Sequence, residues 1–206
     1  MVSDANHAPP PPHLGERPAP GKPFWVFGYG SLMWRPGFDY ETAYDAVLHG
    51  YSRSFCIYSF HHRGTRASPG LVLGLDAGGE CLGRIFRVRG EDAERVTAYL
   101  EERELVNYPY IARFLPVEAR GADAPRSVVA WTFVADPDHP DYAGGLPVEK
   151  AASLIMRASG IAGLNRDYLM QTVRHLETAG FVDEHLHALL REIETQTGII
   201  DMGSGI

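Results

Sequence analysis

The sequence predicts an α+β protein of 206 residues in which most strands precede most helices. Short runs rich in aromatic and β-branched residues, separated by turn residues, recur through the first 134 residues and predict antiparallel strands. One segment in that part of the chain, residues 91–106, has a helical period, and from residue 147 the pattern is helical to the end. This order is typical of an α+β architecture with its helices gathered late.

Six segments have the composition of strands: 24–27, 51–60, 71–75, 82–88, 114–118 and 127–134. The first is a continuous apolar run, which predicts a buried strand. Between the third and fourth lies Asp76-Ala-Gly-Gly79, whose residues predict a hairpin turn. The polar segment 120–125 predicts another turn between the last two strands.

Four segments have the apolar period of an amphipathic helix: 91–106, 147–159, 167–179 and 184–197. Glycines 160, 180 and 198 stand where C-terminal caps belong, because glycine adopts the left-handed conformation that ends many helices. Asn165 and Asp183 are candidate N-caps, because their side chains can accept a hydrogen bond from the first turn.

Composition favours an enzyme or binding protein for small molecules. The chain is 45% hydrophobic and 22% charged, which is typical of a globular protein, and its length fits one domain. A formal charge of −7 without a cluster of Lys and Arg argues against a nucleic-acid partner. The two cysteines, Cys56 and Cys81, make neither a disulfide framework nor a zinc spacing, so we expect reduced thiols.

The first 22 residues are Pro-rich and lack the apolar core of a signal peptide. We therefore expect a flexible tail at residues 1–22, followed by a single domain at residues 23–206. No apolar run approaches the ~18 residues of a membrane helix. The sequence predicts a cytoplasmic protein without membrane contact, and it does not predict whether the protein is a monomer or an oligomer.

Glu104 interrupts the apolar face of the 91–106 helix. Counting about 100° per residue from Leu100, Val96 lies at about −40° and Glu104 at about +40°, whereas Glu102 lies at about 200° and faces water. An inward carboxylate loses hydration, which raises its affinity for a proton and suits it to acid/base catalysis. The pattern alone leaves open the alternative that Glu104 pairs with Arg103, Arg113 or another arginine.

The segment Gly28-Tyr-Gly30-Ser31-Leu32 follows the first strand and offers backbone N–H groups and a hydroxyl to a ligand. A tight turn without any ligand is the alternative interpretation. The third glycine of a dinucleotide-binding motif is replaced by Met33, so a Rossmann site is not predicted. Neither His61-His62 nor the acidic segment 136–141 has the spacing of a zinc or calcium site, and we predict no metal and no cofactor.

Several stretches of the chain resemble the ChaC-type γ-glutamylcyclotransferases, and the resemblance covers about residues 24–180. The first is Phe24-Trp-Val-Phe-Gly-Tyr-Gly-Ser-Leu-Met-Trp-Arg-Pro-Gly37. It continues through Leu48-His-Gly-Tyr-Ser-Arg-Ser-Phe-Cys56, His62-Arg-Gly-Thr65, Pro69-Gly-Leu-Val-Leu-Gly-Leu75, Tyr99-Leu-Glu-Glu-Arg-Glu104 and Ala135-Asp-Pro-Asp-His-Pro-Asp-Tyr-Ala-Gly144.

The resemblance implies a small, partly closed β-barrel with flanking helices, and it implies that Glu104 is the general acid/base. It also implies a set of substrate-binding residues around the γ-glutamyl group: Phe27, Gly28, Tyr29, Gly30, Ser31, Leu32, Tyr110 and Tyr142. The chain departs from the family at Leu105-Val-Asn-Tyr-Pro-Tyr110, where a small, glycine-containing stretch is expected. We expect this departure to affect substrate preference more than the reaction.

The expected reaction is the cleavage of glutathione to 5-oxoproline and cysteinylglycine. The α-amine of the γ-glutamyl group attacks its own γ-carbonyl, so the substrate supplies the nucleophile, and the enzyme supplies a base that also protonates the leaving amine. Two alternatives use the same residues. One is a cyclotransferase for other γ-glutamyl amines or amino acids, and the other is a non-catalytic γ-glutamyl-binding protein, which would have no use for a buried Glu104.

Overall fold

The computed structural model describes residues 15–105 and 109–197, and at its centre is a closed barrel. The strands are β1 (Phe24–Gly28), β2 (Thr42–Ser59), β3 (Gly70–Val88), β4 (Tyr110–Arg120) and β5 (Val128–Ala135). Their order is β1-β3-β2-β4-β5, with antiparallel pairing except between β1 and β5, which pair in parallel at Trp25↔Ala130 and Val26↔Trp131. The predicted α+β class and the small mixed barrel are confirmed, and the barrel is closed rather than partly closed.

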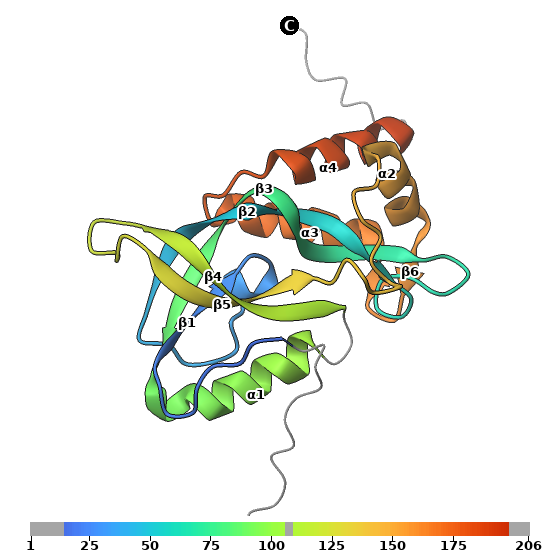
Figure 1. The fold of residues 1–206 in the computed structure, drawn as a ribbon. Coiled ribbons are helices and arrows are strands. Elements are labelled where there is room, and N and C mark those ends of the chain that lie inside the picture. The colour runs from blue at the N-terminus through green and yellow to red at the C-terminus, as the bar shows by residue number, and fades with distance from the viewer. Residues whose placement is uncertain (1–14, 106–108, 198–206) are drawn as a thin grey trace, which may run out of the picture.

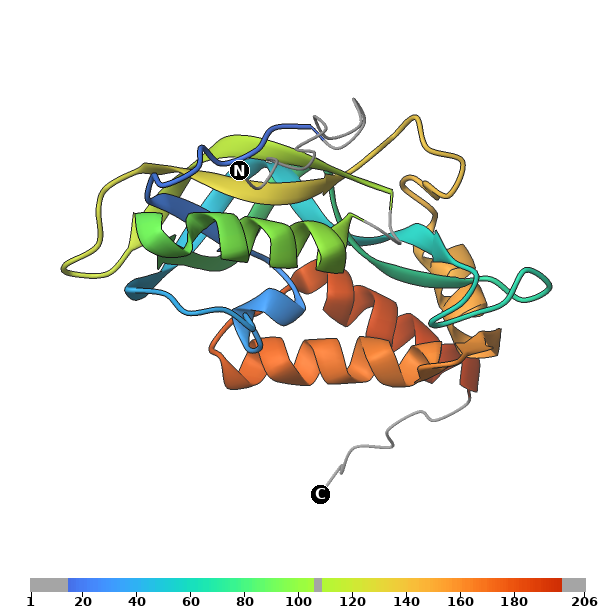
Figure 2. The same ribbon diagram turned by 90° about the horizontal axis from the view of Figure 1, so that it is seen from below.

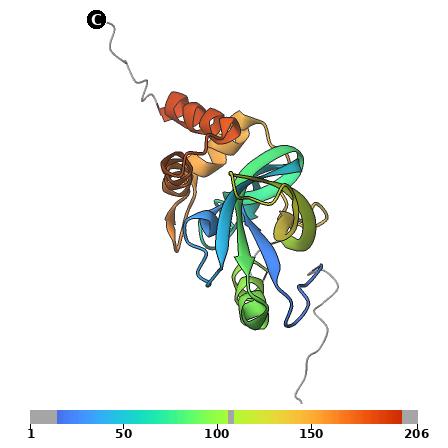
Figure 3. The ribbon, with the colours of Figure 1, turned by 90° about the vertical axis from the view of Figure 1, so that its left-hand side faces the viewer.

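Helices cover two opposite sides of the barrel (Figures 1 and 3). They are α1 (Ala93–Glu104), α2 (Val148–Arg157), α3 (Asn165–Thr178) and α4 (Glu184–Thr197), with short 3₁₀ turns η2 (Ser31–Met33) and η3 (Gly90–Asp92) and a small hairpin of β6 (Ser159–Gly160) and β7 (Gly163–Leu164). Helix α1 lies alone on one side, and the other three helices form a layer on the opposite side (Figure 1). Figure 2 shows η2 between α1 and α3.

Aromatic side chains dominate the core cluster under α1. Trp131 and Phe133 lie with ring centroids 4.8 Å apart, and both are almost completely buried. The apolar face of α1 packs into the same cluster through Val96 and Leu100, as its period predicts. Because this face is fully buried, α1 can lie on the barrel in only one rotation about its axis, and that rotation sets the direction of Glu104.

Strands β2 and β3 differ from the prediction because they pair along almost their whole length. The expected hairpin turn at residues 76–79 is wrong: Gly78 and Gly79 lie inside β3 and form a bulge, with φ angles of 99° and 74°. On either side of the bulge, β3 continues to pair with β2. Glycine composition alone does not distinguish a hairpin turn from a bulge, because both need left-handed backbone angles.

Some predicted helix ends are confirmed and others are wrong. Gly180, at φ 82°, ends α3 in a Schellman motif, in which the N–H of Phe181 bonds to the carbonyl of Leu176 at 2.8 Å. Asp183 caps α4 through a bond from the N–H of Leu186 at 3.1 Å. Gly160 is part of β6, and the side chain of Asn165 bonds to β3 instead of capping α3. Residue 198 lies outside the described residues.

Residues 15–17, which the sequence places in the flexible tail, contact the body of the protein. The N–H of Glu16 donates to the carbonyl of Ala112 at 2.9 Å, and its own carbonyl accepts from the indole of Trp131 at 2.8 Å. Arg17 forms an ion pair of 2.8 Å with Glu101 on α1. This part of the segment therefore docks across β4, β5 and α1, which the Pro-rich composition of the segment did not predict.

Candidate active site

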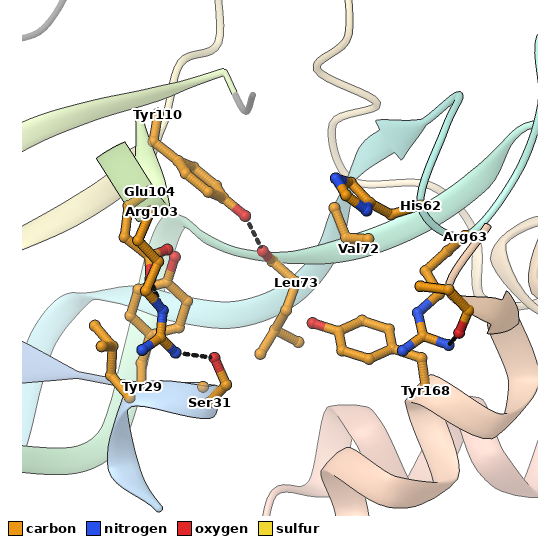
Figure 4. Close-up of a pocket in the computed structure, with 13 residues that line it drawn as sticks. Tyr29, Ser31, His62, Arg63, Val72, Leu73, Arg103, Glu104, Tyr110 and Tyr168 are labelled. Atoms are coloured by element: carbon orange, nitrogen blue, oxygen red, sulfur yellow. Dashed lines mark hydrogen bonds and ion pairs between the residues drawn. The ribbon is translucent and has the colours of Figure 1, made fainter. Parts of the chain in front are cut away.

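A cavity of about 280 Å³ opens beside the C-terminal end of α1 (Figure 4). Its size is close to the lower end of the ~300–1,000 Å³ range of small-molecule sites. One side is formed by the loop after β1 and by the last turn of α1, and the other side is formed by the β2–β3 turn, the β6–β7 hairpin and α3. Glu104 lines this cavity together with four of the predicted substrate-binding loop residues, Tyr29, Gly30, Ser31 and Leu32.

Glu104 is the last residue of α1, and its side chain is only 17% exposed. Burial raises the pKa of Glu104 above its ordinary value, and the nearby charge of Arg103 acts in the opposite direction. The Nε atom of Arg103 lies 3.1 Å from Oε1 of Glu104. Both interpretations left open by the sequence are thus present together, since the carboxylate is inward and is also paired with Arg103. Glu102 is exposed, as predicted.

Arg103 fixes the end of α1 against the loop that follows β1. Its guanidinium donates to the carbonyls of Arg35 at 2.9 Å and Pro36 at 3.1 Å. It also donates to Oγ of Ser31 at 2.8 Å, the bond drawn in Figure 4. Because one side chain contacts both Glu104 and Ser31, the carboxylate and the loop are held in a fixed relation across this side of the cavity.

The loop from Tyr29 to Leu32 presents both main-chain and side-chain atoms. Gly30 has no side chain, so it contributes only main-chain atoms to the cavity wall, and a Cβ there would lie 3.2 Å from Leu73. The ring of Tyr29 is buried, and burial, with the charge of Glu104 next, raises the pKa of its hydroxyl well above the usual value. This phenol is therefore a neutral group at physiological pH.

The opposite side of the cavity carries His62, Arg63 and Tyr168 (Figure 4). The guanidinium carbon of Arg63 lies 5.0 Å from the centroid of the Tyr168 ring. The β6–β7 hairpin contributes Ala162, whose carbonyl accepts a hydrogen bond of 2.6 Å from Arg63. None of these residues was predicted to contribute to the site.

A family model for ChaC-like proteins matches residues 24–196. The chain belongs to this family. Among its relatives, the glutathione-specific gamma-glutamylcyclotransferase of Escherichia coli is 35% identical over 181 residues, which cover 88% of this chain and 77% of that protein. Glutathione-specific gamma-glutamylcyclotransferase 1 of Mus musculus is 34% identical over 207 residues, 93% of this chain and 91% of that protein.

A solved structure shows the same fold. The crystal structure of a gamma glutamyl cyclotransferase specific to glutathione from yeast superposes with a TM-score of 0.74, covering 84% of this chain and 96% of that chain. The two sequences are 23% identical, so the likeness establishes the barrel and its helices only.

The other predicted substrate-binding residues of this ChaC-like protein lie in different places. Leu32 and Tyr110 line the cavity, and the hydroxyl of Tyr110 donates to the carbonyl of Leu73. Phe27 and Gly28 belong to β1 and lie outside the cavity lining. Tyr142 also lies outside it, and its hydroxyl donates to Oδ1 of Asp76 at 2.6 Å. The binding roles of all these residues stay predictions. Tyr108, in the segment where the chain departs from the family, lies outside the described residues.

The described residues contain no group of three or more His, Cys, Asp or Glu side chains placed to hold a metal ion. His61-His62 and the acidic segment 136–141 were the candidate metal sites in the sequence, and neither forms such a group among the described residues.

Within the described part of the chain, no helix is both long and apolar enough to cross a membrane.

Arg53 contacts the loop that follows β1, although it was not among the residues predicted from the sequence. Its buried guanidinium donates to the carbonyl of Tyr29 at 2.5 Å, to the carbonyl of Leu82 at 2.5 Å and to Oδ2 of Asp183 at 2.5 Å. These acceptors come from the loop after β1, from β3 and from the start of α4. The burial of Arg53 could have been predicted, because the alternation of side chains along β2 places Arg53 on the same buried face as Phe55.

Replacing Asp183 with Asn should destabilise the protein by about 2–3 kcal/mol, because the Arg53 guanidinium loses its charged partner while it stays buried. The Asn side chain keeps an acceptor for the N–H of Leu186, so loss of the helix cap is not the cause. Urea unfolding measures the difference. Asp167→Asn, which removes an exposed carboxylate near Arg166, is the matched control and should change stability by less than about 0.5 kcal/mol. Equal effects of the two substitutions would show that the Arg53–Asp183 pair contributes little.

Proposed function

We propose that the protein cleaves glutathione by intramolecular attack of the γ-glutamyl α-amine on the γ-carbonyl, giving 5-oxoproline and cysteinylglycine. The observation that carries the proposal is the mostly buried carboxylate of Glu104, which lines a small cavity on the same side as Gly30 and Ser31. Relatives about one-third identical over most of the chain are named glutathione-specific gamma-glutamylcyclotransferases, which supports the same substrate. A small-molecule partner and a cytoplasmic location belong to this proposal.

Proton transfer is the task that Glu104 would perform. The α-amine is an ammonium at neutral pH, and it has no lone pair for attack until a base removes a proton. Burial raises the pKa of Glu104, which brings its proton affinity closer to that of the amine and makes the transfer less unfavourable. The neutral amine adds to the γ-carbonyl and closes the five-membered ring in a tetrahedral intermediate. Protonated Glu104 gives its proton to the leaving nitrogen as the peptide C–N bond breaks, and the second proton lost by the ring nitrogen passes to the released amine, which leaves as an ammonium.

The loop after β1 would hold the reacting group and stabilise the tetrahedral intermediate. Gly30 and Ser31 line the cavity on the same side as Glu104, and the donors we assign to the intermediate are the Gly30 N–H and the Ser31 hydroxyl. A fixed loop matters because ring closure needs the amine and the carbonyl in attack geometry. The bonds from Arg53 to Tyr29 and from Arg103 to Ser31 restrict this loop from two sides.

Incubation of the purified protein with glutathione should release 5-oxoproline, because the substrate carries its own nucleophile. Glutathione acetylated on its α-amine should not react, since an amide nitrogen cannot attack the γ-carbonyl. Mass spectrometry of both reactions provides the measurement. Turnover of the acetylated substrate at a comparable rate would indicate hydrolysis instead of ring closure.

Glu104→Gln should reduce 5-oxoproline formation by about 10⁴-fold, because the amide cannot accept a proton and one group serves both transfer steps. The melting temperature should stay equal or rise, because a neutral amide replaces a carboxylate that burial disfavours. Glu102→Gln, on the exposed face of the same helix, is the matched control and should change neither quantity. An active but destabilised Glu104→Gln protein would make the Arg103–Glu104 pair purely structural.

Arg103→Gln should move the acidic limb of the kcat/KM profile to higher pH. The charge of Arg103 lowers the pKa of Glu104 against the effect of burial, so its removal raises that pKa further. The base must be deprotonated, and activity is therefore lost at a higher pH as the solution is acidified. The pH at which this acidic limb falls does not depend on what fraction of the protein is active, so partial misfolding of the variant would not shift it. Arg95→Gln, an exposed residue of the same helix, is the control and should leave the limb in place.

A further inference from the structure

Arg63 is the charged group on the side of the cavity that the proposed reaction does not use. It follows the end of β2, and it lies with His62 and Tyr168 across from Glu104, Tyr29 and Ser31 (Figure 4). The reaction needs an acid/base and donors at the γ-carbonyl, and all of these lie on the Glu104 side. A guanidinium on the opposite side therefore calls for a different explanation.

The guanidinium of Arg63 is held in place on two sides. Its Nη1 donates to the carbonyl of Ala162 at 2.6 Å and to the carbonyl of Leu164 at 3.3 Å. The ring of Tyr168, 5.0 Å from the guanidinium carbon, adds a cation–π contact. The two carbonyls occupy both N–H groups of Nη1, which leaves the edge formed by Nε and Nη2. That edge has the two parallel donors that bind a carboxylate with both oxygens.

Arg63 also lacks a carboxylate partner within residues 15–105 and 109–197, where it forms no ion pair. The other arginine of the cavity differs, because Arg103 lies 3.1 Å from Glu104. A half-buried arginine that is clamped at one nitrogen and unpaired at its other edge is suited to an anion that comes with the ligand.

Glutathione brings such an anion at the required end. Its α-carboxylate belongs to the γ-glutamyl group and stays near the reacting carbonyl. Its second carboxylate ends the glycine, two residues beyond the bond that breaks, and two extended residues reach about 7 Å. When the γ-glutamyl group occupies the Glu104 side, the leaving peptide extends toward the opposite side of the cavity.

We propose that Arg63 binds the C-terminal carboxylate of the substrate and so selects γ-glutamyl peptides that end in a free carboxylate over γ-glutamyl amines and amidated peptides. The inference rests on the proposed glutathione cleavage and specifies its substrate class. It assigns Arg63 a role in specificity, separate from the acid/base role of Glu104.

The test compares glutathione with glutathione whose glycine carboxylate is replaced by a primary carboxamide. The wild-type protein should process the amide with a kcat/KM lower by about 10- to 100-fold, the usual effect of losing a charge-assisted hydrogen bond. In Arg63→Gln this ratio should fall to about 1–3, chiefly because glutathione itself is processed less well. Arg63→Lys keeps the positive charge but lacks the two parallel N–H donors, so it should give an intermediate ratio. Taking the ratio within each protein makes it independent of the fraction that is folded.

The matched control is Arg66→Gln, which removes the same charge from the same β2–β3 turn at an exposed residue outside the cavity lining. Its ratio should equal that of the wild type. A wild-type ratio near 1, or an Arg63→Gln ratio as large as the wild-type one, overturns the role of Arg63 and leaves the proposed reaction standing. If the wild-type protein releases no 5-oxoproline from either compound, the proposed reaction and this inference both fail.

Discussion

The buried guanidinium of Arg53 is the constraint on which the arrangement of the site depends. A charge with 1% exposure is tolerable only when its donors are occupied, and Arg53 finds acceptors on the β1 loop, β3 and the first turn of α4. The carbonyl of Tyr29 cannot move without leaving this guanidinium partly unsatisfied. The helical layer and the loop after β1 are thereby coupled through one side chain, although they come from opposite ends of the chain.

The position of Glu104 follows from a second, apolar constraint. The buried face of α1 fixes the rotation of the helix. Glu104 is the last residue of α1, and it lies on that face beside the cavity. One turn earlier, at Leu100, a carboxylate would be enclosed by apolar side chains, and at Glu102 it would be hydrated. Only at the end of this face does a carboxylate become desolvated enough for its pKa to rise while it still reaches a ligand.

The sequence predicts features governed by local periodicity, and it fails where the outcome depends on which segments meet. The helical period identifies α1 and the inward Glu104, and the glycine at 180 identifies the end of α3. The bulge at Gly78 and Gly79 was predicted as a turn, because only the pairing partner on β2 determines which of the two forms. Arg63 was missed for the same reason, since its clamp and its aromatic neighbour are about 100 residues later in the chain.

The two sides of the cavity have separate origins in the fold, so the proposed chemistry and the proposed selectivity have separate structural supports. Glu104, Ser31 and Tyr29 are joined through Arg103 and Arg53, whereas Arg63 is held by the β6–β7 hairpin and α3. A contact to a remote carboxylate supplies binding energy that helps to hold the amine against the carbonyl, so losing it lowers kcat/KM without removing the base. Changes in the β6–β7 hairpin could therefore alter which γ-glutamyl compounds react while proton transfer stays the same. Changes beside Glu104 would alter every substrate alike.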